Sequence, residues 1–141
     1  MTMIEFHFKS DFILDDKTKY SDWITRIFES ESFVAGQIDY IFCTDDYLLE
    51  LNKQYLNHDT LTDIITFDYT KGKTISGDIF ISTDRVKENA DAFGVAFENE
   101  LHRVMSHGLL HLMGYGDKTV EEKAEMRRKE EEKIKMFHVE Q

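Results

Sequence analysis

Two histidines, His107 and His111, lie four residues apart in a stretch that is otherwise apolar. On a helix, residues at i and i+4 project from the same face, so both imidazoles can reach one metal ion. Gly114 permits a sharp left-handed turn after the helix, and that turn can present Asp117 as a third ligand. Three protein ligands leave a fourth position open to water, as in catalytic zinc sites. The spacing therefore predicts a hydrolase with one zinc ion per chain, bound by His107, His111 and Asp117.

Two other interpretations of this pattern stay open. A bare His-x-x-x-His pair also fits two unrelated polar positions on a helix, although an unpaired imidazole within an apolar helix would be costly. The spacing is also similar to the zinc motif of metzincin peptidases, whose general base is a glutamate directly after the first histidine. Gly108 occupies that position. A metalloprotease would therefore need another base, which disfavours it.

Composition predicts a single domain over residues 1–141, soluble and cytoplasmic. The chain is 41% hydrophobic, which is enough to bury a core, and it contains no proline and no low-complexity linker. Its apolar stretches are too short to span a membrane, and its N-terminus lacks the pattern of a secretion signal. Cys43, the single cysteine, is expected to be a buried thiol in a reducing compartment. A net charge of -11 gives nucleic-acid binding no support from composition.

Hydrophobic periodicity indicates alternating strands and helices. Strands are expected over residues 4–8, 37–43, 63–69 and 77–82, and helices over residues 20–29, 44–55, 82–92, 97–113 and 119–137. The last helix is rich in Glu, Lys and Arg, which suits packing along one narrow side. The order predicts an α+β fold, with a small mixed sheet of about four strands packed with helices and a zincin-like metal helix.

The histidine segment closely resembles the signature of the YbeY family of bacterial rRNA maturation factors. The matching residues are His107, Gly108, Leu110, His111, Leu112, Gly114 and Tyr115. Two further blocks resemble the family: Leu51-Asn52 with Tyr55, Asp59, Thr62-Asp63 and Phe67, and the strand over residues 77–82. The third ligand of the family is usually histidine, whereas this chain has Asp117. A carboxylate there lowers the charge of the site by one and makes harder metals more competitive.

The resemblance implies a zinc-dependent endoribonuclease that acts on single-stranded RNA. Its expected role is rRNA maturation, including processing of the 3′ end of 16S rRNA, and ribosome quality control. The implied partners are rRNA and the ribosome or a ribosomal protein, without a membrane. An alternative from another class is a non-catalytic ribosome-assembly factor with a metal-stabilised fold, because the acidic charge also fits a basic ribosomal protein.

One departure from the family concerns substrate phosphate. The family commonly has an arginine where this chain has Leu56. His58 is the first candidate to replace it, as a catalytic or phosphate-binding residue, and Lys53 is the second; His58 also fits an exposed loop histidine. Thr62 and Asp63 precede a strand, where capping of a turn is an equally good interpretation. By resemblance, the strand that begins at Gly77 is expected to run along the cleft and to hold an extended substrate.

Overall fold

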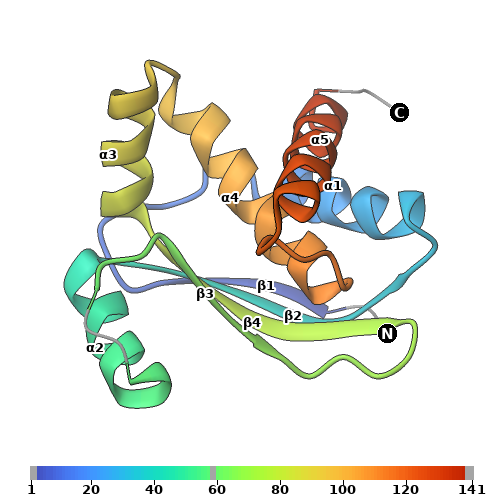
Figure 1. The fold of residues 1–141 in the computed structure, drawn as a ribbon, viewed down its shortest axis with the longest axis horizontal. Helices are drawn as coiled ribbons and strands as arrows, with labels where there is room; N and C mark the ends of the chain where they lie inside the picture. The colour runs from blue at the N-terminus through green and yellow to red at the C-terminus, as the bar shows by residue number, and fades with distance from the viewer. Residues whose placement is uncertain (1–2, 58–59, 139–141) are drawn as a thin grey trace.

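The computed structural model describes residues 3–57 and 60–138, and its elements follow the order expected from the sequence (Figure 1). The strands are β1 (Met3–Phe8), β2 (Val34–Cys43), β3 (Ile64–Asp68) and β4 (Thr74–Ser82). The helices are α1 (Lys17–Ser30), α2 (Asp45–Leu56), α3 (Thr83–Phe93), α4 (Phe97–Leu112) and α5 (Val120–Met136). Each predicted element is present, with its ends shifted by a few residues. The predicted α+β fold with a four-stranded mixed sheet is confirmed.

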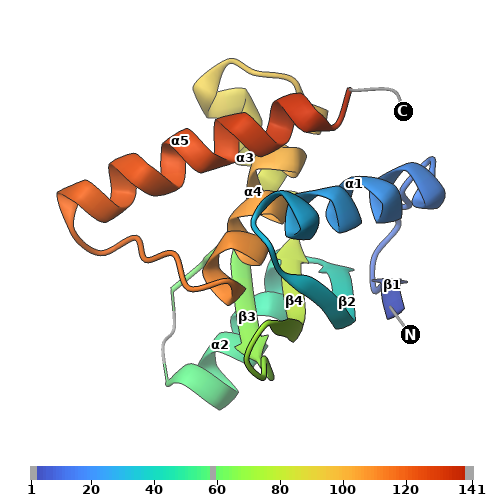
Figure 2. The ribbon, with the colours of Figure 1, turned by 90° about the vertical axis from the view of Figure 1, so that its right-hand side faces the viewer.

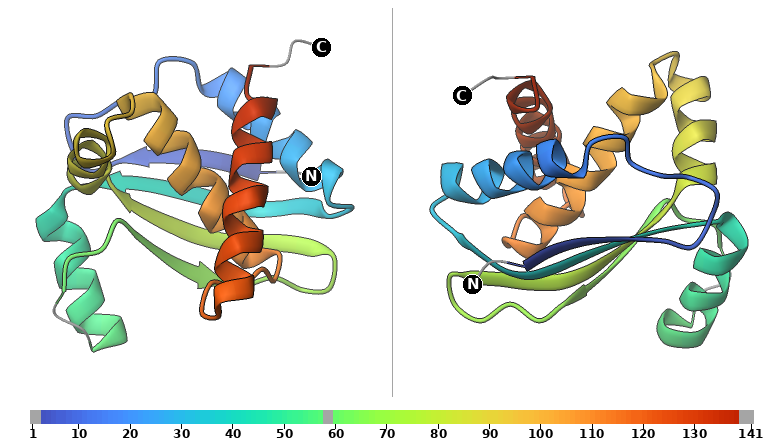
Figure 3. Two further views of the ribbon diagram at one scale, coloured as in Figure 1. Left: turned by 45° about the horizontal axis from the view of Figure 1, so that its top comes forward. Right: turned by 180° about the vertical axis from the view of Figure 1, so that it is seen from behind.

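The sheet has the strand order β1-β2-β4-β3. Strands β1, β2 and β4 are parallel, and β3 pairs with β4 in the antiparallel direction. Helices α1 and α4 lie over one face of this sheet, whereas α2 lies against the other face, as the rear view in Figure 3 shows. Strand β3 is therefore an edge strand, and one of its faces is turned toward α4.

The main core lies between the sheet and helices α1 and α4, because both layers turn an apolar side to it. Side chains alternate along a strand, so Phe6, Tyr40 and Phe42 point to the same face and stack on one another. The Tyr40 hydroxyl donates to the Met105 carbonyl at 2.9 Å and ties β2 to α4. Trp23 of α1 is fully buried. Full burial of one large apolar side chain contributes about 1.5–3 kcal/mol to the free energy of unfolding.

A smaller cluster under α2 encloses the single cysteine. Cys43 and Leu48 are buried together with Ile65 of β3. Burial, with a smaller contribution from Asp84 and Asp45, raises the pKa of the Cys43 thiol to about 12. The thiol therefore stays protonated and unreactive, which confirms the predicted buried cysteine.

Helix α5 crosses α4 and α1 on the side away from the sheet (Figure 2). It begins with a capping box between Thr119 and Glu122. Its buried side carries Met126 and Ile134, as expected, but also the charged residues Glu130 and Lys133. In the part of the chain that is described, none of the helices has both the length and the apolar character needed to cross a bilayer.

Candidate metal centre

A cavity of about 480 Å³ is lined by β3, α4 and α5 and by the end of α3. His107 and His111 reach it from α4, and Asp117 reaches it from the loop before α5. The charged lining is otherwise made of Asp63, Glu100, Glu130, Arg103 and Arg127. The three residues that the sequence predicts as metal ligands therefore line one cavity.

The end of α4 directs the chain toward the cavity through a Schellman motif. The Tyr115 N–H donates to the Leu110 carbonyl and the Gly114 N–H donates to the His111 carbonyl, each at 3.0 Å. Gly114 has a φ of +105°, which residues with a side chain rarely adopt. The predicted glycine turn is present, and it leads to Asp117 three residues later.

A carboxylate from α5 fixes the orientation of His107. The His107 Nδ1 lies 2.7 Å from Glu130 Oε2, and the Nε2 lies 3.4 Å from Asp117 Oδ2. Arg103 donates to the other oxygen of Glu130 at 3.2 Å. Burial alone would lower the pKa of His107, but Glu130, with Asp117 and Asp63, outweighs burial and raises that pKa. An imidazole that donates one N–H to a carboxylate presents its other nitrogen to a metal, an arrangement common in zinc proteins.

The three predicted ligands are not equally close. His107 and Asp117 lie side by side. His111 lines the same cavity, but the ligand atoms of the three residues do not all lie within 4.8 Å of one another. His111 is exposed, so a change of rotamer needs no repacking of the core. The donor set of two imidazoles and a carboxylate is that of a catalytic zinc site. Carboxylates in the lining also outnumber guanidinium groups by two, four against two, which suits a divalent cation.

Comparisons with known proteins point to one family. A family model described as "Endoribonuclease YbeY" matches residues 5–138. The chain belongs to the YbeY family. It is 55% identical to the proteins named "Endoribonuclease YbeY" of Flavobacterium psychrophilum and Flavobacterium johnsoniae, over 99% of this chain and 99% and 100% of theirs. A solution structure of a Thermotoga maritima protein is similar with a TM-score of 0.67 and 26% identity, over 96% of this chain and 89% of that one.

The structure also contains groups outside this YbeY cavity that could hold a metal ion. Two such groups, among residues 3–57 and 60–138, have ligand atoms within 4.8 Å of one another: Glu98, His102 and His138, and Glu5, His7 and Asp39. The Nε2 of His102 lies 2.9 Å from the Tyr20 hydroxyl in the core, as expected for a structural histidine. His7 Nε2 lies 2.8 Å from Asp39 Oδ1, and both side chains project from the face of the sheet opposite α4.

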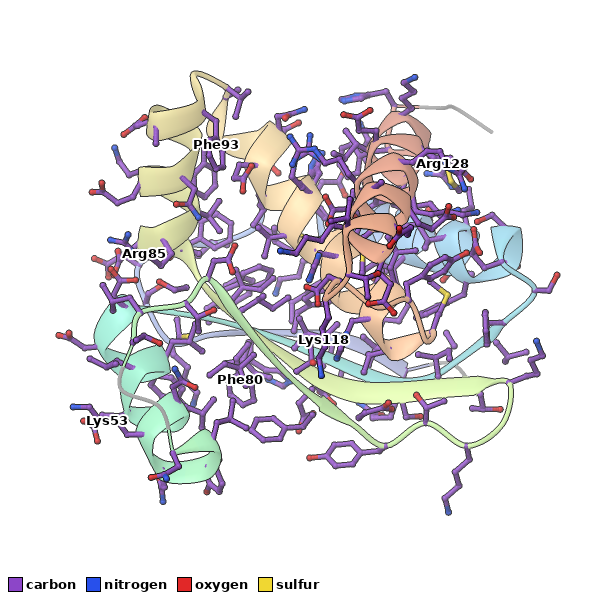
Figure 4. The ribbon with its side chains drawn as sticks, viewed as in Figure 1. Lys53, Phe80, Arg85, Phe93, Lys118 and Arg128 are labelled. Carbon is purple, nitrogen blue, oxygen red and sulfur yellow. The ribbon has the colours of Figure 1, made fainter. Side chains whose placement is uncertain are left out.

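A second cavity of about 460 Å³ adjoins the first, and the two share His111 and part of β3. Leu56, which stands where the YbeY family commonly has an arginine, lines this second cavity. His58 lies outside the described residues. Lys53 lines neither cavity, and Figure 4 shows it on the outer side of α2. Its side chain therefore does not take the place of the family arginine in the second cavity.

One expectation about the YbeY cleft needs correction. The strand that begins at Gly77 belongs to β4, which is paired on both sides and cannot hold an extended substrate at its edge. The edge strand along both cavities is β3. Asp63, for which turn capping was an equally good interpretation, also lines the cavity, and burial raises the pKa of its carboxyl despite the opposing effect of His107.

Gly108 explains why the peptidase pattern is absent from this helix. A Cβ at this position would meet Ile64 Cδ1 and Ile79 Cγ2 at 3.0 Å each. The position therefore faces the sheet, and a glutamate placed there would be buried against isoleucines and not directed into the cavity. The general base of a metalloprotease is therefore absent from the sequence at position 108, and a glutamate there would not fit.

Sequence reasoning missed Glu130, Arg103, Arg127 and Phe93 as residues of the cavity. Glu130 had a detectable signal, because it falls at helical spacing between Met126 and Ile134, where an apolar residue is expected. A charged residue at such a position needs a buried partner. The sequence offers no indication that this partner is His107, 23 residues away.

Proposed function

We propose that this chain is a zinc-dependent endoribonuclease, with His107, His111 and Asp117 as ligands of one ion and single-stranded RNA as substrate. The observation that carries the proposal is the orientation of His107, whose Nδ1 is bound by Glu130 and whose Nε2 faces Asp117. Membership of the YbeY family supports RNA as the substrate, because relatives 55% identical to this chain are named endoribonucleases.

The residues around the cavity have separate tasks in this proposal. When bound, the ion would supply Lewis-acid polarisation of a phosphoryl oxygen and activation of water near neutral pH. Glu130 keeps the His107 proton on Nδ1, which leaves the lone pair of Nε2 for the ion. Arg103 holds Glu130 in place. Asp63 lines the same cavity, and burial raises the pKa of its carboxyl.

The test compares wild-type protein, loaded with zinc, with an Asp117→Ala variant on one RNA sequence in single-stranded and duplex form. Single-stranded RNA should be cut inside the chain, and Asp117→Ala should abolish cutting without a large change in melting temperature. Asp22→Ala removes an exposed carboxylate from α1 and should behave as wild type. Undiminished cleavage by Asp117→Ala would refute the ligand assignment. A steep fall in its melting temperature would indicate a structural metal instead.

We further propose rRNA as the substrate in the cytoplasm, including the 3′ end of 16S rRNA, with a role in ribosome quality control. The family supports this, and the net charge of -11 favours a basic ribosomal protein as an additional contact. The alternative of a non-catalytic assembly factor predicts zinc-dependent stability without RNA turnover. The cleavage assay therefore separates the two functions.

A further inference from the structure

Phe93 is a large apolar side chain that stays exposed beside the charged cavity. It is the last residue of α3, it lines the cavity, and 63% of its surface is accessible. Figure 4 shows it at the end of α3, beside α4. Single exposed apolar residues are common, but this one is the only phenylalanine, tyrosine or tryptophan among the described residues that line the cavity. Its flat face is therefore available to a ligand that enters the cavity.

Arg127 is the cation of the same cavity that remains available to a substrate. The side chain of Arg103 is 15% exposed, and its guanidinium pairs with Glu130 at 3.2 Å and with Glu100 at 3.8 Å. The side chain of Arg127 is 60% exposed, and its ion pair with Glu131 is long, at 3.9 Å. An exposed pair of this kind contributes little and is easily exchanged for another anion.

We propose that Phe93 and Arg127 form a nucleotide-binding subsite, in which the Phe93 ring stacks on one nucleobase and the Arg127 guanidinium contacts a neighbouring phosphate of single-stranded RNA. This inference rests on the proposed endoribonuclease function. Stacking on an aromatic ring requires a base that is free of its own neighbours, so the subsite selects single strands. It also supplies binding that does not depend on charge, where four carboxylates repel the RNA backbone.

The two halves of the subsite predict different signatures in binding. The probe is a fluorescein-labelled single-stranded RNA with phosphorothioate linkages, which resist hydrolysis, followed by anisotropy across a range of salt concentrations. Phe93→Ala should weaken binding by about 5- to 150-fold, as expected for the loss of one stacked base, without a change in salt dependence. Arg127→Gln should lower the slope of log affinity against log salt by about 0.7, as expected for one lost phosphate contact.

Matched variants separate stacking from other effects. Phe93→Leu should be as weak as Phe93→Ala, whereas Phe93→Trp should bind at least as tightly as wild type. Arg128→Gln is the control for Arg127, because Arg128 is 63% exposed on the side of α5 away from α4 (Figure 4). Tyr69→Ala is the control for Phe93, because Tyr69 is 59% exposed and lines neither cavity. Both controls should bind as wild type.

Kinetics with unmodified RNA provide the second readout. Phe93→Ala should raise KM and leave kcat unchanged, since Phe93 binds substrate without taking part in the chemistry. Wild-type affinity in Phe93→Ala or Phe93→Leu, or an unchanged salt slope in Arg127→Gln, would overturn the subsite. If wild-type protein binds the RNA with these signatures but does not cleave it, the proposed function fails and the subsite stands.

Discussion

Helix α5 buries charged side chains in two places, and the two clusters differ in what they leave free. The cavity cluster consists of His107, Glu130 and Arg103, and the Nε2 of its histidine faces a cavity. The staple cluster consists of Glu31, Lys133 and Lys129, and it joins α5 to the end of α1. Each contains a carboxylate held by two hydrogen-bonding partners or more; Glu130 is buried and Glu31 is partly buried. Only the cavity cluster has a potential metal-ligand atom, the Nε2 of His107, that faces a cavity.

The staple cluster is closed by its own hydrogen bonds. Lys133 is fully buried, and its Nζ lies 2.6 Å from Glu31 Oε2. The Tyr115 hydroxyl donates to the other oxygen of Glu31 at 2.6 Å. Burial alone would raise the pKa of Glu31, but the bonds from Lys133, Tyr115 and Lys129 lower it to about 2. Buried charge alone therefore does not mark a functional site, whereas buried charge that orients a free ligand atom does.

Glu31→Gln should produce the largest change in stability and the smallest in activity. Removing the charged partner of a buried lysine should lower the free energy of unfolding by about 3 kcal/mol. The cleavage rate per folded molecule should stay at the wild-type value. Urea unfolding followed by the fluorescence of Trp23, the single tryptophan, measures the loss, with Glu29→Gln on the exposed side of α1 as control. If Glu31→Gln lost activity without losing stability, the staple cluster would have a functional role, and the distinction between the two clusters would be wrong.

The contribution of the Glu31 carboxylate to the free energy of unfolding should vanish in acid. Glu31 has a lower pKa in the folded chain, about 2, than its ordinary value of 4.5, so it stabilises the fold above about pH 4.5 and less as the pH falls toward 2. The stability difference between wild type and Glu31→Gln should therefore shrink over this range. Melting temperatures of both proteins at a series of pH values measure it. A difference that stays constant down to pH 2 would mean that the carboxylate is not held by Lys133.

Glu130→Gln should affect metal binding more than stability. Loss of the carboxylate that orients a ligating histidine typically lowers metal affinity or activity by about 10–100-fold. Competition with a zinc-binding dye measures the affinity, and Glu121→Gln, an exposed position on α5, is the control. If Glu130→Gln leaves the zinc affinity unchanged and lowers the stability as much as Glu31→Gln does, the cavity cluster has only a structural role.

Leu56→Arg should produce the smallest effect, an increase in RNA affinity. The new cation would line the second cavity, beside His111, and add about 0.7 to the salt slope of single-stranded RNA binding. Gln54→Arg adds the same charge to α2 at an exposed position that lines neither cavity, and it should leave the slope unchanged. Equal slopes for the two variants would show that position 56 does not face RNA.

Local patterns in the sequence predicted much of the fold and part of the site. The spacing of His107 and His111 and the glycine at position 114 are properties of one helix and its end, so they can be read without knowledge of the tertiary structure. Glu130 and Arg103 depend on how α5 crosses α4, and Lys133 meets Glu31 across 102 residues of chain. Such contacts are set by packing, which periodicity does not specify. The position of β3 at the edge of the sheet was missed for the same reason.

Elemental analysis of the purified, untagged protein tests the central claim most directly. Wild type should contain about one zinc per chain, and His111→Ala should lose it. His7→Ala and His138→Ala each remove one histidine from the two other groups that could hold a metal, and both should keep the zinc. Zinc retained in His111→Ala, or lost in either of the other variants, would contradict the assignment of the metal to His107, His111 and Asp117.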